Sequence, residues 1–486
     1  MFKSALIETV KTFSKQEIKD FGAFVQSPFF NTNQSVIKLY EQVRKLYPDF
    51  DEKDLEKQIL FKKAFGEIKY NDSFMRMTIF RFQELAKEFL VHRNLQNNNL
   101  LKETLLLDEL NIRELNNLML KSINDLDTKI EKQKVKEADT YFAKYKLEYF
   151  KNEAKALDTK MITYKDILDK NLMHEQKNLN IFFFLSSLKF FQYFLNQKNF
   201  VVKTEGYPEF MNNILEYLKH NNEYLNIPAL KIYYYMVLML VTNDDKYFFE
   251  LEKLLYEDED DISYFEKFNL IATLRNYAQR KYNEGNKDFK TSLIGIVKFS
   301  INKNILSPSP EGKFISEMRF MNIVWTGVHT NELIWLEEFI KKFINRIDPD
   351  KRQYVSAYNL AVLEFAKGNY SEALEKLGKS GSIKNVLYKA AIKQLTLMVY
   401  YELKWFIPAY DLLEAYRHFI KTNKLLPETY ITRGNMFINY YNRLLNINDN
   451  VEKNTDFKLS KLISEIKLTS QDWLLKKAQE LETKRL

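Results

Sequence analysis

The 486-residue sequence predicts an all-α fold in which stacked antiparallel helical hairpins form an α-solenoid. Glycine and proline are scarce, at 11 and 9 residues, whereas all-β folds need turn residues about every 8–12 positions. Apolar residues recur at the three- and four-residue spacing of amphipathic helices along most of the chain. In the C-terminal half a helix-turn-helix pattern also recurs after 36 positions, from Ala373 to Ala409. A period near that length is typical of helical repeats.

Residues 1–95 are predicted to form an N-terminal helical bundle. Its first clear helix signal is Ser14-Lys15-Gln16-Glu17, which matches a capping box. Proline and glycine then divide the region, because the residue before a proline is disfavoured in a helix and glycine suits a helix end. The predicted breaks are residues 27–31, Pro48 and Gly66, and the last helix runs from about Asn71 to His92. Four asparagines between 93 and 99 predict a polar break after it.

Residues 96–305 are predicted to form a central region of helical hairpins. Long, charged amphipathic helices fill 100–175, and the helices from 178 to 300 carry more apolar residues. The acidic run 257–261 suits the start of a helix, where the helix dipole favours negative charge. It lacks the ligand spacing of a calcium loop. Residues 304–312, with two prolines, form the predicted linker to a C-terminal region at 313–486.

The C-terminal region contains one segment, 354–377, with the pattern of a known repeat. Gly368 lies at the turn between two predicted helices, Tyr370 follows it, and Ala373 and Leu377 continue the second helix. Gly368 can adopt the left-handed conformation that ends a helix, and Ala373 is small where two helices must approach closely. The segment resembles a tetratricopeptide repeat. A weaker copy without the glycine follows, with its turn at 403–406.

Resemblance to the tetratricopeptide family implies a protein-binding scaffold with a concave groove lined by the first helix of each repeat. We therefore expect a TPR-like C-terminal region, a protein or peptide partner, and a non-enzymatic role as an interaction scaffold or regulator. The alternative is that the same side chains only pack against an adjacent helix. The expected groove residues are Tyr358, Asn359, Val362 and Phe365 in the first copy and Gln394, Met398 and Tyr401 in the second.

No catalytic, cofactor or metal site is predicted. The chain has no cysteine, which excludes disulfides, thiolate nucleophiles and cysteine-ligated zinc. Its five histidines include no i, i+4 pair, and His174-Glu175 lacks the second histidine of a zinc-protease helix. Gly378-Lys379-Ser380 looks like the end of a phosphate-binding loop, but it follows a predicted helix instead of a strand.

Nucleic-acid binding by the basic C-terminal half is the alternative function. The chain carries a formal net charge of +8, and residues 367–443 hold 12 basic and 6 acidic side chains. Basic and aromatic residues also alternate in places, for example between Arg76 and Phe82. Amphipathic helices commonly produce both features, so protein binding is favoured.

The apolar runs predict no membrane insertion. The longest, 181–195 and 232–241, are interrupted by polar residues or fall short of the roughly 20 apolar residues of a membrane-spanning helix. Residues 1–13 lack the shape of a signal peptide, because Glu8 and Lys11 interrupt the apolar stretch. A cytoplasmic location is therefore expected, and heavy use of Lys, Asn, Ile, Phe and Tyr suggests a bacterium with an AT-rich genome. No feature of the sequence indicates an oligomeric state.

Overall fold

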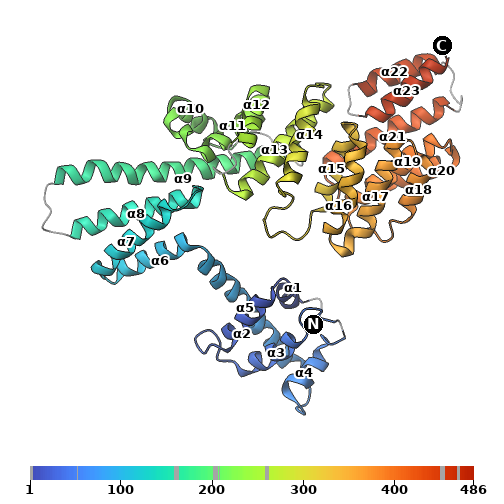
Figure 1. Cartoon of the computed structure of the whole chain (residues 1–486). Coiled ribbons are helices and arrows are strands. Elements are labelled where there is room, and N and C mark those ends of the chain that lie inside the picture. The colour runs from blue at the N-terminus through green and yellow to red at the C-terminus, as the bar shows by residue number, and fades with distance from the viewer. Residues whose placement is uncertain are drawn as a thin grey trace. The chain divides into compact units, whose positions relative to one another are not determined.

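The structure is a computed structural model that describes residues 4–51, 53–157, 164–200, 206, 208–257, 262–448, 455–467 and 471–485. These residues form 23 α-helices, two short 3₁₀ helices and no β-strand (Figure 1). Most helices pack against the next helix in the chain. The predicted all-α fold is therefore confirmed, as is the packing of helices in neighbouring pairs. Residues 258–261 of the acidic run lie outside the described residues.

The chain divides into two units, which are considered separately. Unit 1 comprises Met1–Lys132 and Ala143–Glu175, and unit 2 comprises Gln133–Phe142 and Gln176–Leu486. The three regions expected from the sequence, 1–95, 96–305 and 313–486, stay a prediction. Helices α8 (Ala138–Leu157) and α9 (Tyr164–Phe200) contribute residues to both units. The helices wholly within unit 1 are α1 (Ala5–Lys11), α2 (Lys15–Gln26), α3 (Gln34–Lys45), α4 (Lys57–Phe65), α5 (Asp72–Asn97), α6 (Asn99–Ile112) and α7 (Asn116–Glu131).

Helix α2 begins with the predicted capping box. The Ser14 hydroxyl accepts a hydrogen bond from the Glu17 amide at 3.2 Å, and the Ser14 amide donates to the Glu17 carboxylate at 2.6 Å. The predicted break at 93–99 is confirmed, but it is confined to Asn98, between α5 and α6. Helix α5 continues to Asn97, and the Asn98 side chain accepts from the Leu101 amide at 3.1 Å to cap α6. Asparagine is tolerated on an exposed helix face and favoured at a helix start, so the cluster of asparagines did not mark a longer loop.

Aromatic rings fill the core formed by the first five helices. The Phe21 ring centroid lies 5.0 Å from that of Phe89 and 5.7 Å from that of Tyr40. Tyr40 is buried, and its hydroxyl donates to the Ile18 carbonyl at 2.7 Å. Gly22 allows α2 to approach this tyrosine, because a Cβ atom at Gly22 would lie only 2.5 Å from the Tyr40 hydroxyl oxygen.

We expect Gly22→Ala to destabilise unit 1 by about 1–2 kcal/mol, because the new methyl group must displace a buried ring that is held by a hydrogen bond. The gain in helix propensity, about 1 kcal/mol, is smaller than the cost of the clash. Gly378→Ala is the matched control, since a Cβ atom there meets nothing within 4 Å, and it should not destabilise. Urea unfolding followed by circular dichroism measures both changes. A Gly22→Ala variant as stable as the wild type would contradict the packing described here.

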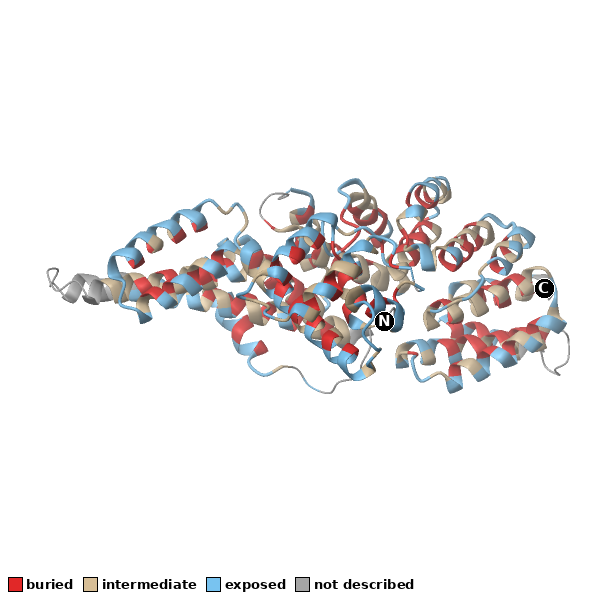
Figure 2. Ribbon diagram, turned by 90° about the horizontal axis from the view of Figure 1, so that it is seen from below, coloured by how far each residue is buried: buried red, intermediate tan, exposed pale blue. Residues whose placement is uncertain are grey.

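Unit 2 continues as a series of paired helices, and Figure 2 shows their buried residues on the sides that face neighbouring helices. Helices α15, α17 and α19 also contact one another in turn, although one helix separates each from the next along the chain. Its helices beyond α9 are α10 (Met211–His220), η1 (Asn222–Asn226), α11 (Pro228–Thr242), α12 (Asp245–Glu257), α13 (Tyr264–Asn283), α14 (Phe289–Asn302), α15 (Glu317–His329), α16 (Leu333–Phe343), η2 (Ile344–Arg346), α17 (Pro349–Lys367), α18 (Tyr370–Gly378), α19 (Val386–Glu402), α20 (Phe406–Thr422), α21 (Glu428–Asn448), α22 (Thr455–Lys467) and α23 (Asp472–Arg485).

Four successive hairpins, from α13–α14 to α19–α20, turn in the same way. Each has one residue with a left-handed backbone, and the φ angles are 98° at Gly285, 60° at Asn331, 87° at Gly368 and 60° at Lys404. In each hairpin, the amide of the residue after the left-handed one donates a hydrogen bond to the carbonyl five residues before it. For example, the Trp405 amide donates to the Tyr400 carbonyl at 2.8 Å. This is the hydrogen-bond pattern that ends a helix in a Schellman motif. The last three turns are 37 and 36 residues apart in the sequence.

The segment between α14 and α15, expected from the sequence to be a linker, packs onto unit 2. Leu306 is fully buried within it. The Arg346 guanidinium donates to the Asn304 side chain at 2.5 Å and to the Gly312 carbonyl at 3.2 Å. These contacts join both ends of the segment to η2, so the segment is part of the packed structure of unit 2.

Candidate functional site

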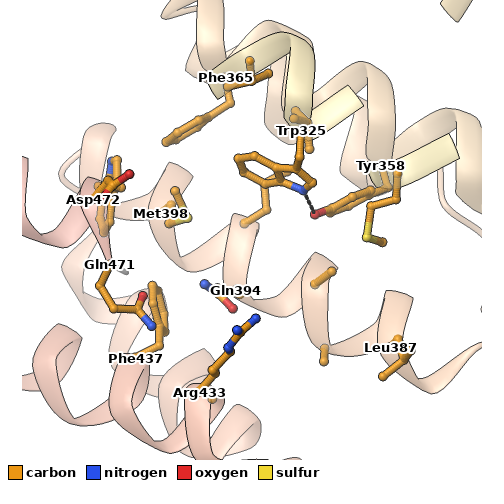
Figure 3. Close-up of a pocket in the computed structure, with 18 of the residues that line it drawn as sticks. Trp325, Tyr358, Phe365, Leu387, Gln394, Met398, Arg433, Phe437, Gln471 and Asp472 are labelled. Carbon is orange, nitrogen blue, oxygen red and sulfur yellow. Dashed lines mark hydrogen bonds between the residues drawn. The ribbon is translucent and has the colours of Figure 1, made fainter. Parts of the chain in front are cut away.

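A cavity in unit 2 is lined mainly by every second helix of the hairpin series. Its volume is about 480 Å³, within the range typical of ligand sites. The wall comes from α13, α15, α17, α19 and α21, from one residue of α20, and from residues 471–474 at the start of α23. Most of the lining side chains are apolar, and several are drawn in Figure 3.

The same three positions of successive helices face this cavity. The turn residues Asn331, Gly368 and Lys404 give a common reference. The positions ten, six and three residues before each turn lie on one helical face, because they are spaced by four and then three. They are occupied by Met321, Trp325 and Val328 on α15, Tyr358, Val362 and Phe365 on α17, and Gln394, Met398 and Tyr401 on α19. Eight of these nine residues line the cavity; Tyr401 does not.

Five of the seven expected groove residues line the cavity: Tyr358, Val362, Phe365, Gln394 and Met398. Asn359 is instead fully buried, and its amide donates to the Val355 carbonyl at 2.7 Å and to the Tyr388 hydroxyl at 3.3 Å. Tyr401 is also buried, with its ring 5.5 Å from that of Trp473. These two side chains therefore take part in helix packing. The partner-binding role of all seven residues stays a prediction.

Trp325 and Tyr358 form a hydrogen-bonded pair within the apolar wall. The Trp325 indole nitrogen donates to the Tyr358 hydroxyl at 3.0 Å, as Figure 3 shows. Burial raises the pKa of Tyr358, and burial raises the pKa of Tyr416 to about 12, so both hydroxyls are neutral near pH 7. Around them the cavity presents the side chains of Phe365 and Met398, which suit an apolar occupant.

The start of α23 supplies one wall of the cavity through an aromatic contact. The Trp473 ring lies 5.5 Å from Tyr401 and 6.2 Å from Tyr441, and its indole nitrogen donates to the Glu402 carboxylate at 2.8 Å. The Lys477 ammonium reaches the same carboxylate at 2.9 Å. The C-terminal helix is thereby held against α19 and α21.

Polar side chains reach the cavity from α19, α21 and the start of α23. Figure 3 shows Gln394 and Arg433 pointing toward one another and Gln471 beside Phe437. Asp472 lies on another side, near Phe365. The cavity thus combines a large apolar surface with one cation, one anion and three side-chain amides, the third being that of Asn283.

His329 lines the cavity at the end of α15, and burial lowers its pKa; Asp472 opposes this shift and Arg275 adds to it. The ring Nδ1 lies 3.4 Å from the Gln279 amide nitrogen, and in a neutral ring this Nδ1 can accept a hydrogen bond from that amide. Because the folded pKa is below the unfolded value of about 6.5, the unfolded chain binds the proton more tightly. The folded state therefore has its full unfolding free energy, as far as His329 is concerned, above pH 6.5. Part of this free energy is lost as the pH falls from 6.5 through the folded pKa.

We expect the His329 ring to titrate with a midpoint below 6.5 in the folded protein, as measured by the proton NMR shift of its Cε1–H. His329→Gln assigns the resonance. This variant should also remove a fall in unfolding free energy below pH 6.5, whose slope is at most about 1.4 kcal/mol per pH unit for one proton. A midpoint at or above 6.5 would show that the ring is not desolvated.

Several cavity residues were not found from the sequence. Trp325 holds on α15 the position that Val362 holds on α17, but its hairpin turns at Asn331, where no glycine marks the turn. Arg433 and residues 471–474 come from helices without the repeat pattern. Asparagine often adopts the left-handed conformation at a helix end, so an asparagine six residues after an aromatic residue is a sequence signal that could have identified Trp325. The contribution of α23 depends on tertiary packing and has no such signal.

Metal-ligating side chains do not cluster in the described part of the chain: no group of three or more His, Cys, Asp or Glu residues there could hold a metal ion. In the described residues, no helix combines the length and the apolar character needed to cross a membrane. No protein-family model matches the chain, and no curated protein or solved structure matches it.

Proposed function

We propose that the chain is a non-enzymatic interaction scaffold whose unit 2 is a tetratricopeptide-like solenoid that binds a segment of a partner protein in the cavity. The observation that carries this proposal is the repeated use of three helix positions, from α15 to α19, to line a single cavity. An extended chain can cross successive helices of such a series and meet a similar set of side chains on each.

The charge distribution favours a protein partner over nucleic acid. At least five of the 12 basic residues in 367–443 are engaged in ion pairs: Lys367, Lys379, Lys384, Arg417 and Arg443. These ion pairs lower the net positive charge that this stretch can offer to phosphates. The cavity itself is apolar and aromatic, as protein-binding hot spots commonly are.

The proposal is tested by filling the cavity. Ala391 lines the cavity on α19 and is partly exposed, so Ala391→Trp should occupy the space without entering the core. Tagged full-length wild type and variant are used to capture partners from the native host. A protein that copurifies is then prepared, and its affinity for both chains is measured at two salt concentrations.

We expect the affinity to fall at least tenfold in Ala391→Trp and to change little with salt. Glu414→Trp is the matched control, because Glu414 lies exposed on α20 and does not line the cavity; it should bind like the wild type. Equal binding by Ala391→Trp and the wild type would place the interface elsewhere. Binding that is abolished by nuclease and falls steeply with salt would instead identify a nucleic-acid partner.

A further inference from the structure

Arg433 presents an uncompensated positive charge to the cavity. It lines the cavity on α21, and it forms no ion pair or hydrogen bond with any described residue. Guanidinium groups bind carboxylates through two parallel hydrogen bonds, and this pairing is strengthened where water is partly excluded. The unpaired guanidinium of Arg433 can therefore bind a carboxylate of an occupant of the cavity.

Two side-chain amides lie beside this guanidinium. Gln394 and Gln471 both line the cavity, and within the described ranges neither side chain makes a hydrogen bond. Figure 3 shows the Gln394 amide directed toward Arg433. Each amide can donate to an oxygen atom of an occupant. Three donors on three different elements thus border one part of the cavity.

A second arginine reinforces the positive potential. Arg275 lies ten residues before the turn residue Gly285, the position that Gln394 has on α19, although Arg275 itself does not line the cavity. Its only hydrogen bond to a described side chain is with the neutral Asn276, at 2.8 Å. Arg275 and Arg433 both oppose the rise in the pKa of Tyr430 that burial causes, which places both charges near this cavity residue.

We propose that the cavity selects an internal peptide segment in which a glutamate or aspartate adjoins a large apolar side chain. The carboxylate binds Arg433 and the amides of Gln394 and Gln471, and the apolar side chain lies among Trp325, Phe365 and Met398. This inference rests on the proposed protein-binding function and specifies its ligand. An internal segment fits because the cavity is lined by successive helices, which an extended chain can cross.

Asp472 limits the charge that the cavity accepts. It lies on the cavity wall near Phe365, apart from Arg433 (Figure 3). A single carboxylate is balanced by Arg433, whereas a phosphate carries about −1.5 to −2 charges at pH 7 and would also be repelled by Asp472. The acidic peptide is therefore preferred over a phosphopeptide with the same apolar residues.

The test uses the full chain and amidated, acetylated, rhodamine-labelled peptides measured by fluorescence anisotropy. The first peptide is Gly-Ser-Phe-Glu-Phe-Gln-Leu-Gly-Ser, which carries a single carboxylate, and the second has its glutamate replaced by glutamine. A third has phosphoserine in place of the glutamate, and a fourth is the glutamine peptide with a free C-terminal carboxylate. We expect the glutamate peptide to bind about tenfold more tightly than the other three.

Arg433→Gln should reduce this preference to less than about twofold. Arg417→Gln removes the same charge from an exposed, ion-paired site on α20 and should keep the tenfold preference. If the glutamate and glutamine peptides bind equally well, the carboxylate assignment is overturned and the peptide-binding function remains. Preference for the phosphoserine or free C-terminal peptide would also overturn it, and absence of binding by all four would count against both proposals.

Discussion

The Lys189→Met variant is expected to lose about 3 kcal/mol of unfolding free energy in unit 2 at pH 7. Lys189 on α9 forms an ion pair with Glu266 on α13, which is 1% exposed and also accepts a hydrogen bond from the Tyr233 hydroxyl. Without the ammonium group the buried carboxylate must stay unpaired or take up a proton. Protonation costs about 1.4 kcal/mol per pH unit above the ordinary carboxyl pKa of 4.5, which gives the expected size.

The pH dependence of this loss distinguishes an ionic origin from lost packing. Burial raises the pKa of Glu266, and Lys189 opposes that rise. A raised carboxyl pKa means that the group favours folding at low pH and opposes it as pH increases. The stability deficit of Lys189→Met should therefore shrink steadily as pH is lowered from 7 toward 5, in urea unfolding followed by circular dichroism.

Lys177→Met is the control on the same helix. Lys177 pairs with Glu223 at 3.4 Å, but both side chains are about half exposed or more, so this ion pair contributes little and its loss should cost less than about 1 kcal/mol. Equal losses in the two variants, or a Lys189→Met deficit that does not change with pH, would show that the buried pair does not stabilise α9 against α13.

The Trp473→Ala variant is expected to destabilise the docking of α23 by about 3 kcal/mol. The substitution removes a ring packed against Tyr401 and Tyr441 and the hydrogen bond to Glu402. A buried tryptophan commonly contributes 3–5 kcal/mol, and the low end applies because Trp473 is only partly buried. Hydrogen exchange of the α23 amides should accelerate roughly a hundredfold, because local opening becomes more frequent.

Trp405→Ala provides the comparison for this result. Trp405 is 49% exposed at the start of α20 and lines no part of the cavity, so exchange in α23 should be unchanged. Because residues 471–474 form a cavity wall, Trp473→Ala should also weaken binding of the acidic peptide. Unchanged exchange in α23 after removal of Trp473 would refute the wall assignment.

The sequence was sufficient to predict the all-α class, several individual helices and five of the residues that line the cavity. The capping box at Ser14 specified the start of α2, and Gly368 specified one hairpin turn, since these residues act locally. From that turn, the 3.6-residue period placed Val362 and Phe365 on the helix face that lines the cavity. Helix caps and turns of this kind can be predicted from the sequence because they depend on residues close together in the chain.

The rest of the site depends on contacts that no local pattern encodes. Lys404 adopts a left-handed conformation that its residue type does not favour, because the packing of α19 against α20 requires the turn. Asn359 and Gln394 have the same polarity and both lie on first helices, yet only Gln394 lines the cavity. Trp473 reaches the cavity from a helix over a hundred residues beyond Phe365, so its role follows only from tertiary structure.

The most direct test of the central claim observes the cavity while it is occupied. Met318, Met321 and Met398 all line it, and ¹³C-methyl labelling of methionine makes each one visible by NMR after assignment by substitution. Titration with the acidic peptide should shift these three resonances and leave that of Met77, an exposed residue of unit 1, unchanged. Binding that shifts methionines of unit 1 and leaves all three cavity resonances in place would contradict the account.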